Sequence, residues 1–145
     1  MQNQSAIRIL IGTVSQKESI VLHVSKIGVE VATEFLRDHS APHQKRFAFS
    51  YTITIKNHGK EPAKLLKRHW FITDANGQVQ EVKGEGVVGE QPLIQPGRSF
   101  RYTSGTILKT PVGSMHGTYQ MVCPNGTYYD AIIPPFRLAV PELVN

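Results

Sequence analysis

Residues 68–77 read RHWFITDANG, and this stretch decides the fold. Its side chains suit the period of two that a half-buried β-strand requires. The Asp74-Ala75-Asn76-Gly77 sequence that ends it is typical of a turn, because Asp and Asn bond to nearby backbone and glycine adopts positive φ. The stretch therefore predicts a strand that turns directly into a second strand over residues 78–82, as a β-hairpin.

The two faces of this predicted strand differ in character, since successive side chains of a strand point to opposite sides. One face carries Leu66, Arg68, Trp70 and Ile72, and the other carries Lys67, His69, Phe71 and Thr73. If Trp70 points into the core, the second face is an exposed strip of basic and aromatic side chains. We predict that Lys67, His69 and Phe71 bind a partner. The alternative is that loops cover this face and leave His69 a partly buried, hydrogen-bonding residue.

The same period of two recurs on both sides of the hairpin. It appears at residues 27–35, 47–55, 100–102, 115–121, 128–133 and 136–140, with turn residues between the segments. No window beyond about ten residues has a clean helical period. We therefore expect about eight short strands in an all-β fold, an antiparallel β-sandwich of immunoglobulin-like layout.

Length and composition indicate one main domain. The chain has 145 residues, 40% of them apolar, which is enough for a single core. We place the domain at residues 24–145 and treat residues 1–23 as an N-terminal extension, either flexible or an edge strand. The apolar patch of residues 7–11 is too short for a membrane span or a secretory core, so we expect a cytoplasmic protein without membrane insertion. The single cysteine, Cys123, fits a reducing compartment and is expected to be a packing residue rather than a nucleophile.

Residues 81–92 read EVKGEGVVGEQP and contain a G-x-G-x-x-G pattern. A dinucleotide fingerprint would need a helix after the last glycine, and Pro92 with the Pro96-Gly97 turn prevents one. Two interpretations remain open. The glycines mark bulges, turns or close backbone approach, or the successive backbone amides from Gly84 through Gly86 to Gly89 form a concave nest for an anion. In the second interpretation Lys83 or Arg98 supplies a counter-charge to pyrophosphate or a dinucleoside polyphosphate.

The titratable residues give little support for catalysis. Six histidines are scattered along the chain, with no H-E-x-x-H motif, no Cys-x-x-Cys pair and no acidic cluster. Asp74 and Asn76 offer oxygen ligands for magnesium, although a turn explains them equally well. We predict no enzyme activity, no metal site and no cofactor. The net charge of +5 attracts acidic ligands, but no RNA-recognition motif is present, which argues against a nucleic-acid partner.

Many ordered motifs, from residue 24 to residue 145, resemble the bacterial ApaG family. The residues that carry the resemblance are Tyr51 to Ile55, Arg68-His69-Trp70, Asp74 to Gly77, Gly84 to Pro92, Pro96-Gly97, Tyr102 to Gly105, Thr110 to Gly113, Met115, Gly117 to Met121 and Ile133 to Phe136. The resemblance implies a fibronectin type III-like sandwich. It also implies a link, by name, to cobalt and magnesium efflux, and a gene often placed beside a diadenosine tetraphosphate hydrolase.

Similar domains in eukaryotes lie in F-box proteins and in a polymerase-delta-interacting protein, which implies a protein-interaction module. The glycine loop of the family has prompted pyrophosphate-binding proposals, and Gly84, Gly86 and Gly89 match it here. We therefore predict a non-catalytic module that binds a protein or a ligand and affects divalent-cation homeostasis indirectly, because a chain without a span moves no ion across a bilayer. Pyrophosphate or dinucleoside-polyphosphate binding by the glycine loop is the alternative.

Overall fold

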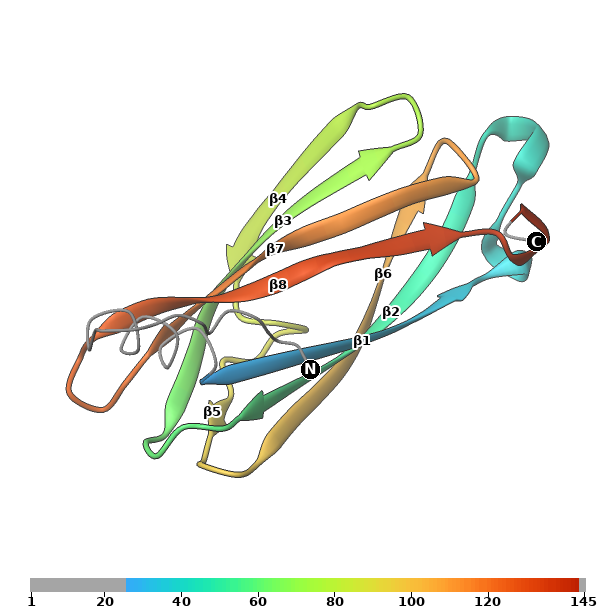
Figure 1. Cartoon of the computed structure of the whole chain (residues 1–145). Coiled ribbons are helices and arrows are strands. Elements are labelled where there is room, and N and C mark those ends of the chain that lie inside the picture. The colour runs from blue at the N-terminus through green and yellow to red at the C-terminus, as the bar shows by residue number, and fades with distance from the viewer. Residues whose placement is uncertain (1–25, 144–145) are drawn as a thin grey trace, which may run out of the picture.

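A computed structural model describes residues 26–143 of the chain (Figure 1). The described residues form two antiparallel β-sheets packed as a sandwich, which confirms the all-β prediction. The immunoglobulin or fibronectin type III-like subtype stays a prediction. None of the helices in this part of the chain is long and apolar enough to cross a membrane. The proposed extension, residues 1–23, lies outside the described residues.

The strands follow one another with short connections. Their bounds are β1 (Ile27–Phe35), β2 (Phe47–Asn57), β3 (Ala63–Asp74), β4 (Val79–Glu85), β5 (Leu93–Ile94), β6 (Ser99–Leu108), β7 (Val112–Val122) and β8 (Tyr128–Ala139). Three single 3₁₀ turns accompany them, η1 (Arg37–His39), η2 (Pro42–Gln44) and η3 (Pro141–Leu143). One sheet has the order β1-β2-β6, and the other has β4-β3-β7-β8 with β5 paired to β3. In Figure 1, β4 lies at the edge of its sheet farthest from β8.

The core lies between the sheets and is built on aromatic rings. Trp70 is 2% exposed and meets the ring of Tyr51 edge-on at 5.4 Å and that of Tyr119 at 6.2 Å. Ile53 from β2 and Leu65 from β3 are completely buried around them. Because Trp70 points inward, its neighbours His69 and Phe71 must point to the opposite face of the sheet.

The predicted faces of β3 are right for its second half and wrong at Leu66. A β-bulge lies between Leu65 and Lys67, so one extra residue on β3 has no counterpart on β7. The bulge shifts the alternation, and the fully buried residue is Leu65 rather than Leu66. Beyond it, Trp70 and Ile72 are buried as predicted.

The count of eight strands is correct, but two of the boundaries are wrong. Residues 128–133 and 136–140 were expected as separate strands, and the structure joins them in β8. The ladder to β7 has an irregularity opposite Pro134 and Pro135, where β8 has one residue more than β7. Proline is tolerated there because β8 is an edge strand and the bulge needs no ladder bond. The strand that was not predicted is β5, because its two residues are too few to show an alternating pattern.

Four tyrosines make the fold sensitive to alkali. The hydroxyls of Tyr102 and Tyr119 form a buried hydrogen bond of 2.5 Å. Burial raises the pKa of Tyr51, Tyr102 and Tyr119, and it raises the pKa of Tyr129 to about 12. The folded state therefore favours the neutral phenols. Their contribution to stability is complete below pH 10.0, the ordinary value, and is lost as the pH rises through the folded pKa values.

We expect the buried tyrosines to ionise only as the sandwich unfolds. An alkaline titration followed by tyrosinate absorbance and by circular dichroism tests this. The absorbance change assigned to Tyr51, Tyr102 and Tyr119 is expected to coincide with loss of the β-sheet signal. Complete ionisation of all tyrosines while the β-sheet signal persists would contradict the expected burial.

Candidate functional site

The outer face of the five-stranded sheet carries the predicted strip. The register pairs His69 with Lys83 of β4 and with Thr118 of β7, and Thr118 in turn with Ile132 of β8. The neighbouring row joins Lys67 to Gln120 and Asp130 in the same way. Since residues directly opposite each other on antiparallel strands have their side chains on one face, these rows form a continuous surface.

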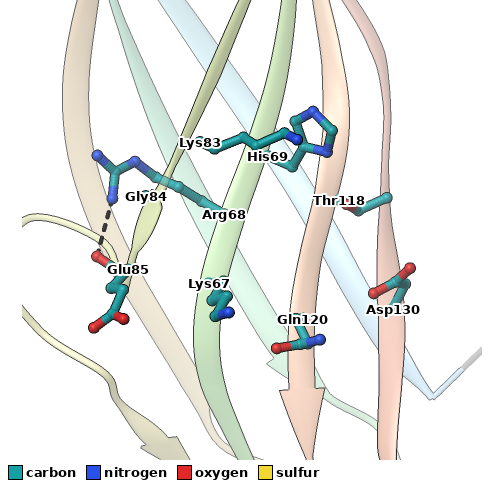
Figure 2. Close-up of a pocket in the computed structure, with 9 residues that line it drawn as sticks. All are labelled: Lys67, Arg68, His69, Lys83, Gly84, Glu85, Thr118, Gln120 and Asp130. Atoms are coloured by element: carbon teal, nitrogen blue, oxygen red, sulfur yellow. Dashed lines mark hydrogen bonds between the residues drawn. The ribbon is translucent and has the colours of Figure 1, made fainter.

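A groove of about 440 Å³ is formed on this surface. Its lining residues are Lys67, Arg68 and His69 of β3, Lys83, Gly84 and Glu85 of β4, Thr118 and Gln120 of β7, and Asp130 of β8. Figure 2 shows them on four adjacent strands, with the carboxylate of Asp130 on the strand farthest from Glu85. The lining is rich in basic side chains, but it also includes the carboxylates of Glu85 and Asp130. The groove therefore offers both hydrogen-bond donors and hydrogen-bond acceptors.

His69, Glu81 and Lys83 form a hydrogen-bonded polar cluster at one end of the groove. The Nε2 atom of His69 lies 2.5 Å from Oε2 of Glu81, and Nζ of Lys83 lies 3.7 Å from the same oxygen. The hydrogen bond from His69, with the nearby Lys83 charge, lowers the pKa of Glu81. The side chain of His69 is 32% exposed. His69 therefore combines both interpretations of the sequence: it faces outward, and it is partly buried and hydrogen-bonded.

Aromatic rings extend the surface beyond the groove. Phe71 lies next to His69 on β3, with ring centroids 4.5 Å apart, and stacks on His116 of β7 at 5.1 Å with an interplanar angle of 15°. Phe71 does not line the groove itself. The three rings form a polar and aromatic surface beside the groove, and aromatic side chains are enriched where proteins contact one another.

Arg68 holds the glycine loop against the sheet. Its Nη1 atom donates to the carbonyl oxygens of Glu85 and Gly86, each at 3.0 Å. The guanidinium lies over Gly84, where a Cβ atom would be 2.7 Å from it. Figure 2 shows Arg68 directed toward β4, away from Lys67 and His69. Position 84 needs a glycine because the Arg68 guanidinium approaches its backbone closely, which is one of the structural roles expected from the sequence.

The glycine loop forms a tight turn. Val87 and Glu90 exchange backbone hydrogen bonds of 2.8 and 2.9 Å, and Gly86 donates to Leu66. The two residues between them, Val88 and Gly89, have φ values of 43° and 82°, as in a type I′ turn. Two amides of the proposed nest, those of Gly86 and Val87, are therefore committed to carbonyls of the protein. This leaves fewer amides for an anion than the sequence pattern suggested.

Val88 is strained, because β-branched residues rarely adopt positive φ. Asparagine adopts this conformation at lower cost and is preferred before glycine in type I′ turns. Val88 is 54% exposed, so its replacement removes little packing. We expect Val88→Asn to raise the free energy of unfolding by about 1 kcal/mol. Urea denaturation measures this, and an unchanged or lower value would show that the turn is not strained.

The structure brings together four of the predicted site residues and separates the others. Lys67, His69, Lys83 and Gly84 line one groove. Gly86 and Gly89 belong to the adjoining turn. Arg98 lies in the turn before β6, where its carbonyl accepts a hydrogen bond from Asn57, and it does not line the groove. It is therefore not placed with Lys83 as a second counter-charge.

Sequence reasoning missed five residues of the groove. They are Arg68, Glu85, Thr118, Gln120 and Asp130. The position of Glu85 beside Lys67 could have been predicted from the hairpin, because the turn at residues 74–77 fixes which residues of β4 share a face with Lys67. The residues of β7 and β8 have no such signal, since the pairing of β3 with β7 joins segments about 50 residues apart and local periodicity does not encode it.

Other candidate residues have structural roles. The Oδ1 atom of Asp74 accepts hydrogen bonds from the amides of Asn76 and Gln78, which explains this turn without a metal. Cys123 is partly buried directly after β7 and is a free thiol. Within residues 26–143, no group of three or more His, Cys, Asp or Glu side chains is arranged to hold a metal ion.

The family model and the relatives of similar sequence agree on one family. The family model of the ApaG domain matches residues 37–123. Protein ApaG of Pseudomonas syringae pv. tomato and that of Pseudomonas aeruginosa PAO1 are each 60% identical over 116 residues, which cover 80% of this chain and 92% of the relative. A crystal structure described as an ApaA protein from Bordetella pertussis has a TM-score of 0.78 and 46% identity, and covers 80% of this chain and 94% of its own. An X-ray structure from structural genomics has a TM-score of 0.80 and 54% identity, and covers 84% and 92%.

Proposed function

The chain belongs to the ApaG domain family, and from that premise we propose that it is a non-catalytic interaction module whose binding surface is the outer face of the β4-β3-β7-β8 sheet. One observation carries the proposal. The groove gathers Lys67, His69 and Lys83 beside the rings of Phe71 and His116, on strands held rigidly by the sheet. Aromatic and cationic side chains on a fixed scaffold are typical anchors for a protein partner.

The charges of the groove favour a polypeptide over a polyphosphate. A polyphosphate placed among Lys67 and Lys83 would also face the carboxylates of Glu85 and Asp130. Like charges facing each other in a binding site weaken association. A polypeptide presents N–H groups to the carboxylates and carbonyl or acidic groups to the cations, and so satisfies both kinds of residue.

Loss of the exposed strip is expected to abolish partner capture. Immobilised wild-type protein and a Lys67→Ala, His69→Ala, Phe71→Ala variant are compared for the proteins they retain from a lysate of the source cells. A Lys56→Ala, Arg101→Ala variant is the control, because it also removes exposed basic side chains, but from the other sheet. Retention that is specific, lost in the first variant and kept in the control supports the proposal. Equal retention by all three proteins contradicts it.

A second candidate function, binding of pyrophosphate or a dinucleoside polyphosphate, has one observation in its favour. Lys67 and Lys83 line the groove beside Gly84, and these side chains rather than loop amides would then hold the phosphates. Isothermal titration with pyrophosphate and diadenosine tetraphosphate, with and without magnesium, tests it. Saturable binding that a Lys67→Ala, Lys83→Ala variant loses and the Lys56→Ala, Arg101→Ala variant retains would favour this function over protein binding.

The family's link to cobalt and magnesium enters this proposal only through a partner. We propose that the domain acts in the cytoplasm and affects divalent-cation homeostasis indirectly, by binding another protein. A deletion strain complemented with the Lys67→Ala, His69→Ala, Phe71→Ala variant tests this step. Cobalt tolerance is expected to stay at the level of the deletion, whereas full complementation would separate cation homeostasis from the proposed surface.

A further inference from the structure

The free edge of β4 is complementary to a second copy of itself. Its outer-face side chains alternate in charge, as Glu81, Lys83 and Glu85. In the described part of the chain β4 pairs only with β3, so its other side has no strand partner (Figure 1). An unpaired edge presents a row of N–H and C=O groups that favours pairing with another strand.

The other sheet edges lack this complementarity. The charged residue of β6 is Arg101, and those of β1 are Glu30 and Glu34, so neither edge offers both signs to a copy of itself. Of the other edge strands, β5 has only two residues, and β8 is interrupted by Pro134 and Pro135 and lies beside β1. Proline removes a donor from the ladder, which protects an edge from pairing.

The ladder to β3 shows which groups of β4 are available. Gly86 donates to Leu66 at one end of the ladder, and Asp74 donates to Gln78 at the other. The ladder between them has no register shift. Since successive residues of a strand direct their backbone groups to alternate sides, the even-numbered residues bond to β3. The odd-numbered residues, Val79, Glu81, Lys83 and Glu85, direct their N–H and C=O groups to the free edge.

The symmetric register centred on Val82 satisfies the backbone and the charges over the whole length of β4. Antiparallel pairing centred on Val82 places every odd-numbered residue of β4 opposite an odd-numbered residue of the second copy, so the free backbone groups face each other. It pairs all seven residues of β4. It also places Glu81 opposite Lys83 of the second copy, twice by symmetry. Moving the centre of the pairing to Glu81 or to Lys83, which is a register shift of two residues, places Glu81 opposite Glu81 or Lys83 opposite Lys83, which is destabilising.

We propose that the chain forms a two-fold symmetric dimer by antiparallel pairing of β4 with β4 about Val82. Such an interface is isologous, because the same strand is used by both copies. The dimer joins the two five-stranded sheets into one and places the two grooves on a continuous outer face, since Lys83 and Glu85 belong to both the groove and the edge. This proposal does not depend on the function proposed for the groove.

The test is a charge swap measured by sedimentation equilibrium at low salt. Wild-type full-length protein is expected to show a mass that rises with concentration from the 16.2 kDa of one chain toward twice that value. Glu81→Lys or Lys83→Glu alone places like charges opposite each other twice and is expected to weaken the dimer about tenfold. The double variant Glu81→Lys, Lys83→Glu restores the pairing, and an equal mixture of the two single variants forms a heterodimer.

The controls separate the edge from general charge effects. Glu30→Lys and Lys56→Glu make the same changes in net charge on the other sheet and are expected to dimerise as the wild type does. Circular dichroism confirms that each variant is folded. Wild-type protein that stays monomeric at all concentrations overturns the proposal. So does a dimer that neither single variant weakens, or one that the double variant fails to restore. Partner capture by a monomeric variant would leave the proposed function intact.

Discussion

Gly117→Ala is expected to lower the free energy of unfolding by about 3 kcal/mol or more, because the site has no room for a methyl group. Gly117 lies in the middle of β7, opposite Trp70 of β3 and Ile133 of β8. A Cβ atom built there overlaps the carbonyl oxygen of His69 and lies 3.2 Å from Cα of Trp70. Both are backbone atoms, which cannot rotate away as the end of a side chain can. The substitution therefore forces β3 and β7 apart at the strand that carries the groove.

The adjacent residue supplies the control. Thr118 lies on the outer face, and Thr118→Ala is expected to change stability by about 0.5 kcal/mol or less. Urea denaturation followed by Trp70 fluorescence measures both variants, since Trp70 is the single tryptophan and contacts the affected position. A Gly117→Ala variant as stable as the Thr118→Ala variant would show that the strands approach less closely than described.

Gly86→Ala is expected to lower the free energy of unfolding by about 2–4 kcal/mol. Two causes combine at this position. Gly86 has a φ of 64°, which L-residues adopt only at a cost, and a Cβ atom there overlaps the carbonyl oxygen of Glu90. That oxygen accepts the hydrogen bond from Val87 that closes the turn. The substitution therefore opens the turn that Arg68 holds against the sheet.

Gly89→Ala separates the two causes. Gly89 has a φ of 82°, but no atom lies within 4 Å of a Cβ built on it. Gly89→Ala is therefore expected to lower the free energy of unfolding only by the cost of the positive φ, about 1 kcal/mol. Thermal denaturation of the two variants under the same conditions gives the difference, and equal losses would mean that the overlap at Gly86 is relieved cheaply. The same overlap makes substitutions of Gly86 unsuitable for testing anion binding, because they disrupt the turn directly.

The fold was largely predictable because its signal is local. A period of two located the long strands, and the Asp74 to Gly77 turn located the β3-β4 hairpin. The errors came from features with no periodic signal. The bulge at Leu66 shifts the alternation by one residue, and β5 is only two residues long. The prolines of β8 suggested a break between strands, whereas an edge strand accommodates them at a bulge.

The candidate site was predictable only on its own hairpin. Lys67 and His69 followed from the inward direction of Trp70, and Lys83 was singled out beside the glycine pattern. The register of the hairpin then places Lys83 opposite His69. Asp130 reaches the groove through two non-local strand pairings, which no nearby residue specifies. Val88 was not singled out, because a valine gives no sequence signal of the positive φ that it adopts.

The central claim is that the outer face of the five-stranded sheet binds another protein. A photo-reactive phenylalanine analogue placed at position 67 or 116 tests it most directly in living cells, with position 56 on the other sheet as the control. All three native residues are exposed, so the analogue leaves the buried core intact, and at position 116 its ring replaces the one that stacks on Phe71. The account predicts cross-links to a different protein from positions 67 and 116 and none from position 56. Absence of cross-links from the outer face, or the same products from position 56, would contradict it.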